Sequence, residues 1–107
     1  MSSFEQKLER YAELAVKVGA NVQPGQTLVV NAMIDAAPLV RLIVKKAYEI
    51  GAKQVKVNYS DEIVSRIRYE LAQDEAFLEP PKYYAAEATE LAEQGAAFLT
   101  VLSSHPD

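Results

Sequence analysis

His105 is the single histidine of the chain, and Asp107 follows it two residues later. Both come after "AFLTVL" (97–102), an apolar run typical of a strand, at the point where open parallel sheets bind ligands. A catalytic zinc ion needs three protein ligands, and one histidine without any cysteine leaves only carboxylates to complete the set. We therefore interpret "SSHPD" (103–107) as a solvated turn. A role for His105 as a ligand or acid–base group is the alternative.

Polar residues also follow the first two apolar runs of the chain. The stretch "NAMIDAAP" (31–38) contains no glycine, which argues against a phosphate-binding turn, so its two polar residues serve a ligand cleft or a turn and helix cap. The serines lack the glycines of a nucleophile elbow, and a single histidine base is present, so a serine hydrolase triad is not supported. The sequence predicts no catalytic and no metal-binding residue in this chain. Its possible cleft-lining residues are Asn31, Asp35, Ser60, Ser104 and His105.

The segment "SDEIVSRIRYE" (60–70) gathers acidic and basic residues within a few helical turns. Asp61, Glu62 and Arg66 have the spacing of solvent-exposed ion pairs, which favours a charged helix face. A cleft rim or a subunit contact is the alternative.

Composition narrows the classes of protein. The chain has 107 residues, 50% of them hydrophobic, which suits one α/β domain over residues 1–107. Its 15 acidic and 11 basic residues are spread along the sequence, so no basic face predicts nucleic acid as a partner. The amino-terminal "MSSFEQKLER" lacks the apolar core of a signal peptide, and no apolar run reaches the ~20 residues of a membrane span. We expect a cytoplasmic protein without a membrane partner.

Glycines mark the ends of the helices that must position these residues. Gly19, Gly51 and Gly95 each follow a helical pattern and precede a β-branched or aromatic run, which predicts three left-handed helix ends. The first helix should bury a stripe of Phe4, Leu8, Tyr11, Leu14, Ala15 and Val18. Asp35 and Ser60 are the expected caps of the second and third helices. The predicted helices cover 4–18, 36–50, 61–73 and 82–94, and the predicted strands cover 27–33, 54–60 and 97–102.

The alternation of strands and helices predicts a small three-layer, Rossmann-like α/β domain with a parallel three-stranded sheet and about four helices. The strand "QVKVNYS" (54–60) alternates apolar and polar residues, so it should lie at an edge, which gives the strand order 2-1-3. The third strand then has a free outer edge without lysine or proline to protect it. We therefore expect a larger sheet that continues beyond residue 107, and self-association of the isolated chain through this strand or adjoining helices.

Four stretches together resemble a known family. They are "FEQKLERYAELAVKVGANVQPGQTLVVNA", "AAPLVRLIVKKAYEIGAKQVKVNYSD", "RIRYELAQDEAF" and "ELAEQGAAFLTVLSSHPD". In this order they are similar to the amino-terminal region of the thermophilic metalloaminopeptidases, the bacterial enzymes related to aminopeptidase T and aminopeptidase S. The resemblance covers essentially the whole chain.

The resemblance implies a hydrolase that removes N-terminal residues from peptides. It also implies that this hydrolase uses two divalent metal ions, cobalt, zinc or similar, in one site. The family holds these ions through its carboxyl-terminal part, so no metal or catalytic residue is carried over to this chain. It further implies a homo-oligomer whose amino-terminal domain forms a wall of the peptide cleft. We expect the isolated chain to be inactive. The competing hypothesis is a free-standing small α/β ligand-binding or assembly module.

Overall fold

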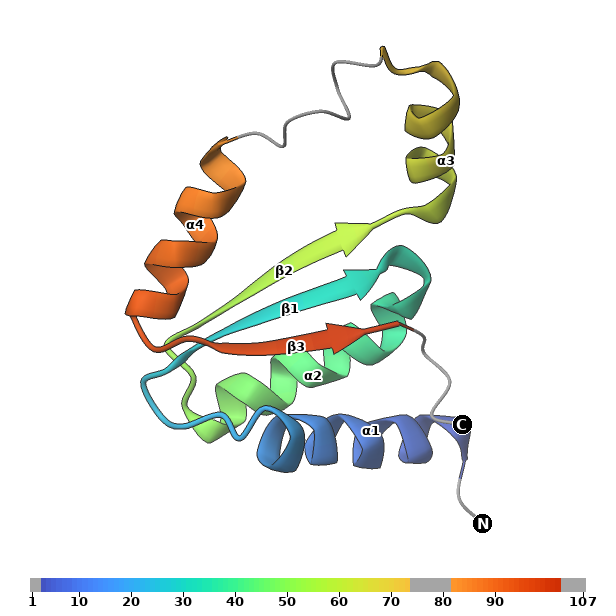
Figure 1. Ribbon diagram of the computed structural model, residues 1–107. Helices are drawn as coiled ribbons and strands as arrows, with labels where there is room; N and C mark the ends of the chain where they lie inside the picture. The colour runs from blue at the N-terminus through green and yellow to red at the C-terminus, as the bar shows by residue number, and fades with distance from the viewer. Residues whose placement is uncertain (1–2, 74–81, 103–107) are drawn as a thin grey trace.

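The computed structural model describes residues 3–73 and 82–102 (Figure 1). The first helix, α1 (Phe4–Leu14), leads through a π-helical turn, Ala15–Gly19, into the first strand. A 3-10 turn, Ile34–Ala36, leads from that strand into the helix α2 (Ala37–Ile50). Within the described ranges, no helix is long and apolar enough to cross a membrane. The elements are α1 (Phe4–Leu14), β1 (Thr27–Met33), α2 (Ala37–Ile50), β2 (Gln54–Ser60), α3 (Glu62–Leu71), α4 (Lys82–Glu93) and β3 (Ala97–Val101).

The three strands form one parallel sheet in the order β2-β1-β3. This confirms the predicted order 2-1-3 and the edge position of β2. The central strand is β1. Its run of Leu28, Val29 and Val30 is buried on both faces of the sheet, which suits a strand with a neighbouring strand on each side. The register sets Asn31 of β1 beside Asn58 of β2 and Thr100 of β3.

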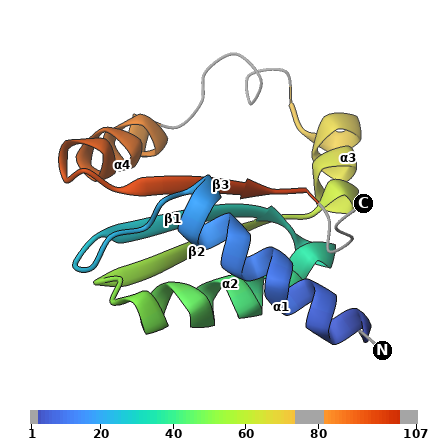
Figure 2. The ribbon, with the colours of Figure 1, turned by 90° about the horizontal axis from the view of Figure 1, so that it is seen from below.

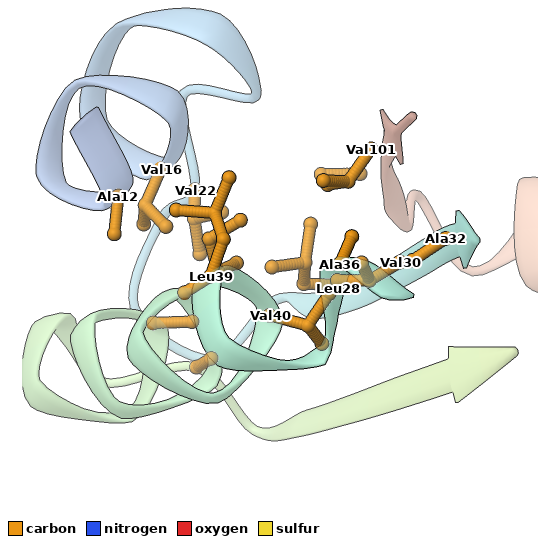
Figure 3. Packing of buried hydrophobic residues seen from close by; sticks show 14 of the residues in the cluster. Ala12, Val16, Val22, Leu28, Val30, Ala32, Ala36, Leu39, Val40 and Val101 are labelled. Atoms are coloured by element: carbon orange, nitrogen blue, oxygen red, sulfur yellow. The ribbon is translucent and has the colours of Figure 1, made fainter. Parts of the chain in front are cut away.

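A core of aliphatic side chains lies between one face of the sheet and the helices α1 and α2 (Figures 2 and 3). Leu28 and Val30 of β1 pack there against Leu39 and Ile43 of α2, and all four side chains are fully buried. Burial of such a side chain contributes about 1.5–3 kcal/mol, so this layer supplies most of the hydrophobic stabilisation of the fold. Alanines at the helix seams let the elements approach closely, among them Ala12, Ala36 and Ala47.

The buried stripe of α1 differs from the predicted one. Leu8, Ala12 and Val16 are buried, a seam of four-residue steps that runs from α1 into the π-helical turn. The predicted members Phe4, Tyr11, Leu14 and Val18 are exposed. The prediction was correct for Leu8, and Ala15 is partly buried against the core. It was wrong for the other four because it favoured large apolar residues. The seam is narrower because Ala12, a small residue, lies at its centre.

Three predicted helix ends and caps also need correction. Gly51 and Gly95 have positive φ as predicted, but Gly19 does not, and Asn21 with φ of 50° takes the left-handed position after the π-helical turn. Ser60 ends β2, and the cap of α3 is Asp61, whose carboxylate accepts hydrogen bonds from the backbone N–H groups of residues 63 and 64 at 2.8 and 3.4 Å. Asp35 lies inside the 3-10 turn, which leaves Ala36 at the cap position of α2 without a side-chain hydrogen bond.

Loops at the amino ends of the strands are joined by hydrogen bonds. The backbone N–H of Gly25 donates to the carbonyl of Gly51 at 2.8 Å, and that of Lys53 donates to the carbonyl of Gln26 at 2.9 Å. The Gln26 side-chain amide donates to the carbonyl of Gly95, 69 residues away, at 2.9 Å. This rim therefore ties all three strands together at one end of the sheet.

The second face of the sheet is only partly covered. The helices α3 and α4 lie on this side, α4 toward the amino ends of the strands and α3 beyond their carboxyl ends (Figures 1 and 2). None of the residues of α3 is buried. The predicted three layers are present, but the second helical layer leaves much of the sheet open.

Candidate functional site

A row of polar side chains crosses the open face of the sheet. Asn58, Asn31 and Thr100 occupy the same register on β2, β1 and β3. The Asn58 side-chain amide donates a hydrogen bond to the side-chain oxygen of Asn31 at 3.0 Å. Asn31, Asn58 and Thr100 are all exposed. We call these three residues the polar row.

A groove of about 500 Å³ lies between the polar row and α4. Its polar lining is Asn31, Asn58, Ser60 and Glu87, and its apolar lining is Val29, Ala88, Leu91 and Phe98. An ion pair between Lys56 of β2 and Glu87 of α4 connects sheet and helix beside it. The groove thus combines hydrogen-bonding amides with apolar walls, the usual character of small-molecule and peptide sites.

The structure divides the predicted cleft residues between two hollows. Asn31 and Ser60 line the same groove, whereas Asp35 lines a separate pocket of about 250 Å³ at the carboxyl ends of the strands. That pocket, which we call the end pocket, is lined by Met33, Ile34, Asp35, Asp61, Glu62, Ile63 and Leu102. Ser104 and His105 lie outside the described residues.

Sequence reasoning missed Asn58 as a groove residue. It read Asn58 as part of the solvated face of an edge strand, without comparing that strand with its neighbour. Asn31 and Asn58 are each the fifth residue of their strands, and β1 and β2 pair from their first residues, Thr27 and Gln54. In-register alignment of the two predicted strands would have placed the two amides side by side.

The donor set of the described residues does not fit a metal ion. Within residues 3–73 and 82–102, no three histidine, aspartate or glutamate side chains gather closely enough to hold one. The groove offers two amides, a hydroxyl and a single carboxylate, that of Glu87, which is paired with Lys56. Amides and hydroxyls donate and accept hydrogen bonds and are poor ligands for zinc. One carboxyl with a changed pKa, Glu13, belongs to α1 on the other side of the sheet, where a hydrogen bond from Lys17 and its positive charge lower the pKa. The arrangement can bind and orient a polar ligand.

Comparison with known proteins gives one consistent result. The thermophilic metalloprotease (M29) family matches residues 4–107. The chain is 58% identical over 107 residues to aminopeptidase AmpS of Bacillus subtilis and 55% identical to aminopeptidase 2 of Geobacillus stearothermophilus. Each match covers 100% of this chain and 26% of the relative, so the chain spans about a quarter of the length of these curated relatives. Among solved structures, wild-type AmpT from Thermus thermophilus superimposes with a TM-score of 0.83 at 37% identity, over 92% of this chain and 25% of that chain.

Proposed function

The chain belongs to the thermophilic metalloprotease family M29, and from this membership we propose that it is the amino-terminal domain of a metal-dependent aminopeptidase, which hydrolyses N-terminal residues from peptides. The match of residues 4–107 at up to 58% identity is the observation that carries this proposal. The relatives named aminopeptidases are about four times as long as the matched stretch. Residues 1–107 then act as one α/β domain of the larger enzyme.

The metal belongs to the rest of that enzyme. The family's name implies a metal, and we propose two divalent ions such as cobalt or zinc, held by residues outside the matched quarter. When bound, such ions polarise a scissile carbonyl and supply a hydroxide near neutral pH. The described residues of this chain do not gather a ligand set for them. We propose that the isolated chain is inactive as a peptidase.

The contribution of this domain is a wall of the peptide cleft. The amides of Asn31 and Asn58 can donate to the carbonyls and accept from the N–H groups of a peptide, while Phe98 and Leu91 provide apolar contact beside them. The enzyme works in the cytoplasm as a homo-oligomer, with neither nucleic acid nor membrane as a partner. In the isolated chain, the free edge of β3 has no lysine or proline to prevent pairing with another copy.

A chimera tests the function directly. The matched quarter of Bacillus subtilis aminopeptidase AmpS is replaced by this chain, and release of leucine from a leucyl peptide is measured with added cobalt, zinc or manganese. The expected result is metal-dependent release by the chimera and none by the 107-residue chain. A folded chimera without activity would contradict the proposed domain role. Metal-dependent release by the purified short chain would contradict its inactivity.

A further inference from the structure

The helix α3 exposes an aliphatic face that nothing in the described structure covers. Ile63, Ile67 and Leu71 recur at four-residue steps, so they lie along one side of the helix. They are 68%, 50% and 78% exposed, and none of the ten residues of α3 is buried. Helices this short are marginal in water unless an apolar face packs against something. A surface that covers this face would therefore stabilise α3.

The exposed face of α3 continues into the end pocket. Ile63 lines that pocket together with Ile34, which follows β1, and Leu102, which follows β3. Ile34 and Leu102 are also exposed, so residues from three elements form one aliphatic surface at the carboxyl ends of the strands. We call the residues Ile34, Ile63, Ile67, Leu71 and Leu102 the α3 patch. The polar row, by contrast, leaves the centre of the open sheet unsuited to a dry contact.

Such a patch fits two occupants, a second copy of this chain or a different polypeptide segment. The charges beside the patch favour the different segment. Asp35, Asp61 and Glu62 line the end pocket beside the patch. A symmetric contact centred on the end pocket would bring the acidic residues of both copies together, which disfavours that arrangement. A different polypeptide segment can present neutral or basic groups to the same residues.

The position of Leu102 favours a segment linked to this chain. Leu102, a member of the patch, directly follows β3 near the carboxyl end of the chain, and the matched relatives contain about three times as much additional sequence. A segment that continues from this point is tethered beside α3 at a high effective concentration, so even a modest surface holds it. The same fold recurs as 25% of the longer Thermus chain, which shows that it occurs within a larger polypeptide.

We propose that the α3 patch is the surface on which the metal-bearing remainder of the enzyme docks, so that α3 fixes the groove against the catalytic part. This inference rests on the proposed function. In the isolated chain, α3 opens easily. In the full-length enzyme, its aliphatic face is covered and its backbone is protected.

Hydrogen exchange of the α3 amides tests this inference without relying on peptidase activity. The 107-residue chain is compared with the full-length chimera in which the rest of aminopeptidase AmpS follows it. We expect the α3 amides to exchange at least tenfold more slowly in the chimera. Equal exchange in the two proteins would overturn the proposal. Protection that instead rises with the concentration of the short chain would assign the patch to a second copy and also overturn it.

A matched pair of variants locates the contact. Ile67→Glu places a charge in the α3 patch, and Ser65→Glu places the same charge on the opposite side of the helix. In the chimera, Ile67→Glu should remove the protection of α3, and Ser65→Glu should preserve it. Both variants should leave the unfolding of the 107-residue chain nearly unchanged, because both positions are exposed there. Equal effects of the two in the chimera would refute the assigned face. Protection without leucine release would refute the proposed function and leave the docking surface standing.

Discussion

Three glycines follow helical segments in similar sequence surroundings, yet their replacement by alanine should have three different effects. Gly19 has no positive φ, and an added Cβ would find its nearest neighbour at 4.0 Å. Gly95 has φ of 76° with open space around the new atom. Gly51 has φ of 113°, and its new Cβ would lie 3.3 Å from the Cβ of Pro24. Among these three positions, an alanine would meet both an unfavourable φ and a close contact only at Gly51.

The expected magnitudes follow from these conformations. A left-handed backbone costs a residue with a Cβ roughly 1–2 kcal/mol, so Gly95→Ala should lower the free energy of unfolding by about that amount. Gly51→Ala should lower it by about 2–3 kcal/mol, because its φ lies beyond the left-handed helical region and Pro24 must also move. Gly19→Ala should raise it by about 0.5–1 kcal/mol, because alanine reduces the freedom of the unfolded chain without strain.

Urea unfolding followed by circular dichroism measures these differences. With a slope of about 1–3 kcal/mol per molar urea for a chain of this size, Gly51→Ala should lower the midpoint by about 1 M or more. Gly19→Ala should raise the midpoint by a fraction of that. Equal losses at all three positions, or a larger loss at Gly95 than at Gly51, would refute this use of φ and contact distance.

Three further predictions concern the core, a helix cap and an ion pair. Leu8→Ala should lower the free energy of unfolding by about 2–5 kcal/mol and Leu14→Ala by far less, measured by the same urea assay, because Leu8 is 4% exposed and Leu14 is 54% exposed. Asp61→Ala should cost about 0.5–2 kcal/mol and speed hydrogen exchange in the first turn of α3, whereas Asp61→Asn keeps an accepting oxygen and most of the protection. Lys17→Gln should raise the pKa of Glu13 toward its ordinary value in an NMR titration, because Lys17 lowers it in the folded state. The small stabilisation from this pair is present above the unfolded pKa of Glu13 and is lost as the pH falls through the lower folded pKa; a titration unchanged by the substitution would contradict the assignment.

Local patterns predicted the strands well because their signals do not depend on distant neighbours. The predicted bounds of β1 and β2 agree with the structure, and the polar alternation of β2 correctly indicated an edge. The buried side of α1 depends instead on how closely that helix approaches α2, a tertiary property. Ala12 lies at the contact between the two helices and sets which side of α1 is buried. The sequence did not reveal this, because a small residue contributes little to a hydrophobic pattern.

The groove could be predicted only in part, because residue type identifies polar positions but not which of them meet. Asn31 and Ser60 were expected to line a cleft, and they line one groove. Asp35 lies in another hollow, because the 3-10 turn carries it past the end of β1. Asn58 was overlooked because its role follows from the register of two strands 27 residues apart.

The 69-residue separation joined by the bond from Gln26 to Gly95 has a kinetic consequence. Closing a loop of that length costs about 4 kcal/mol of chain entropy before β3 gains any contact with β1. The β1–α2–β2 unit closes a much shorter loop, so it should form first and β3 should join late. Until then β1, the strand with the most buried residues in the finished fold, has one unpaired edge on which another unfinished molecule can pair. The yield of soluble protein should therefore depend more on how fast β3 joins β1 than on how well the finished core is packed.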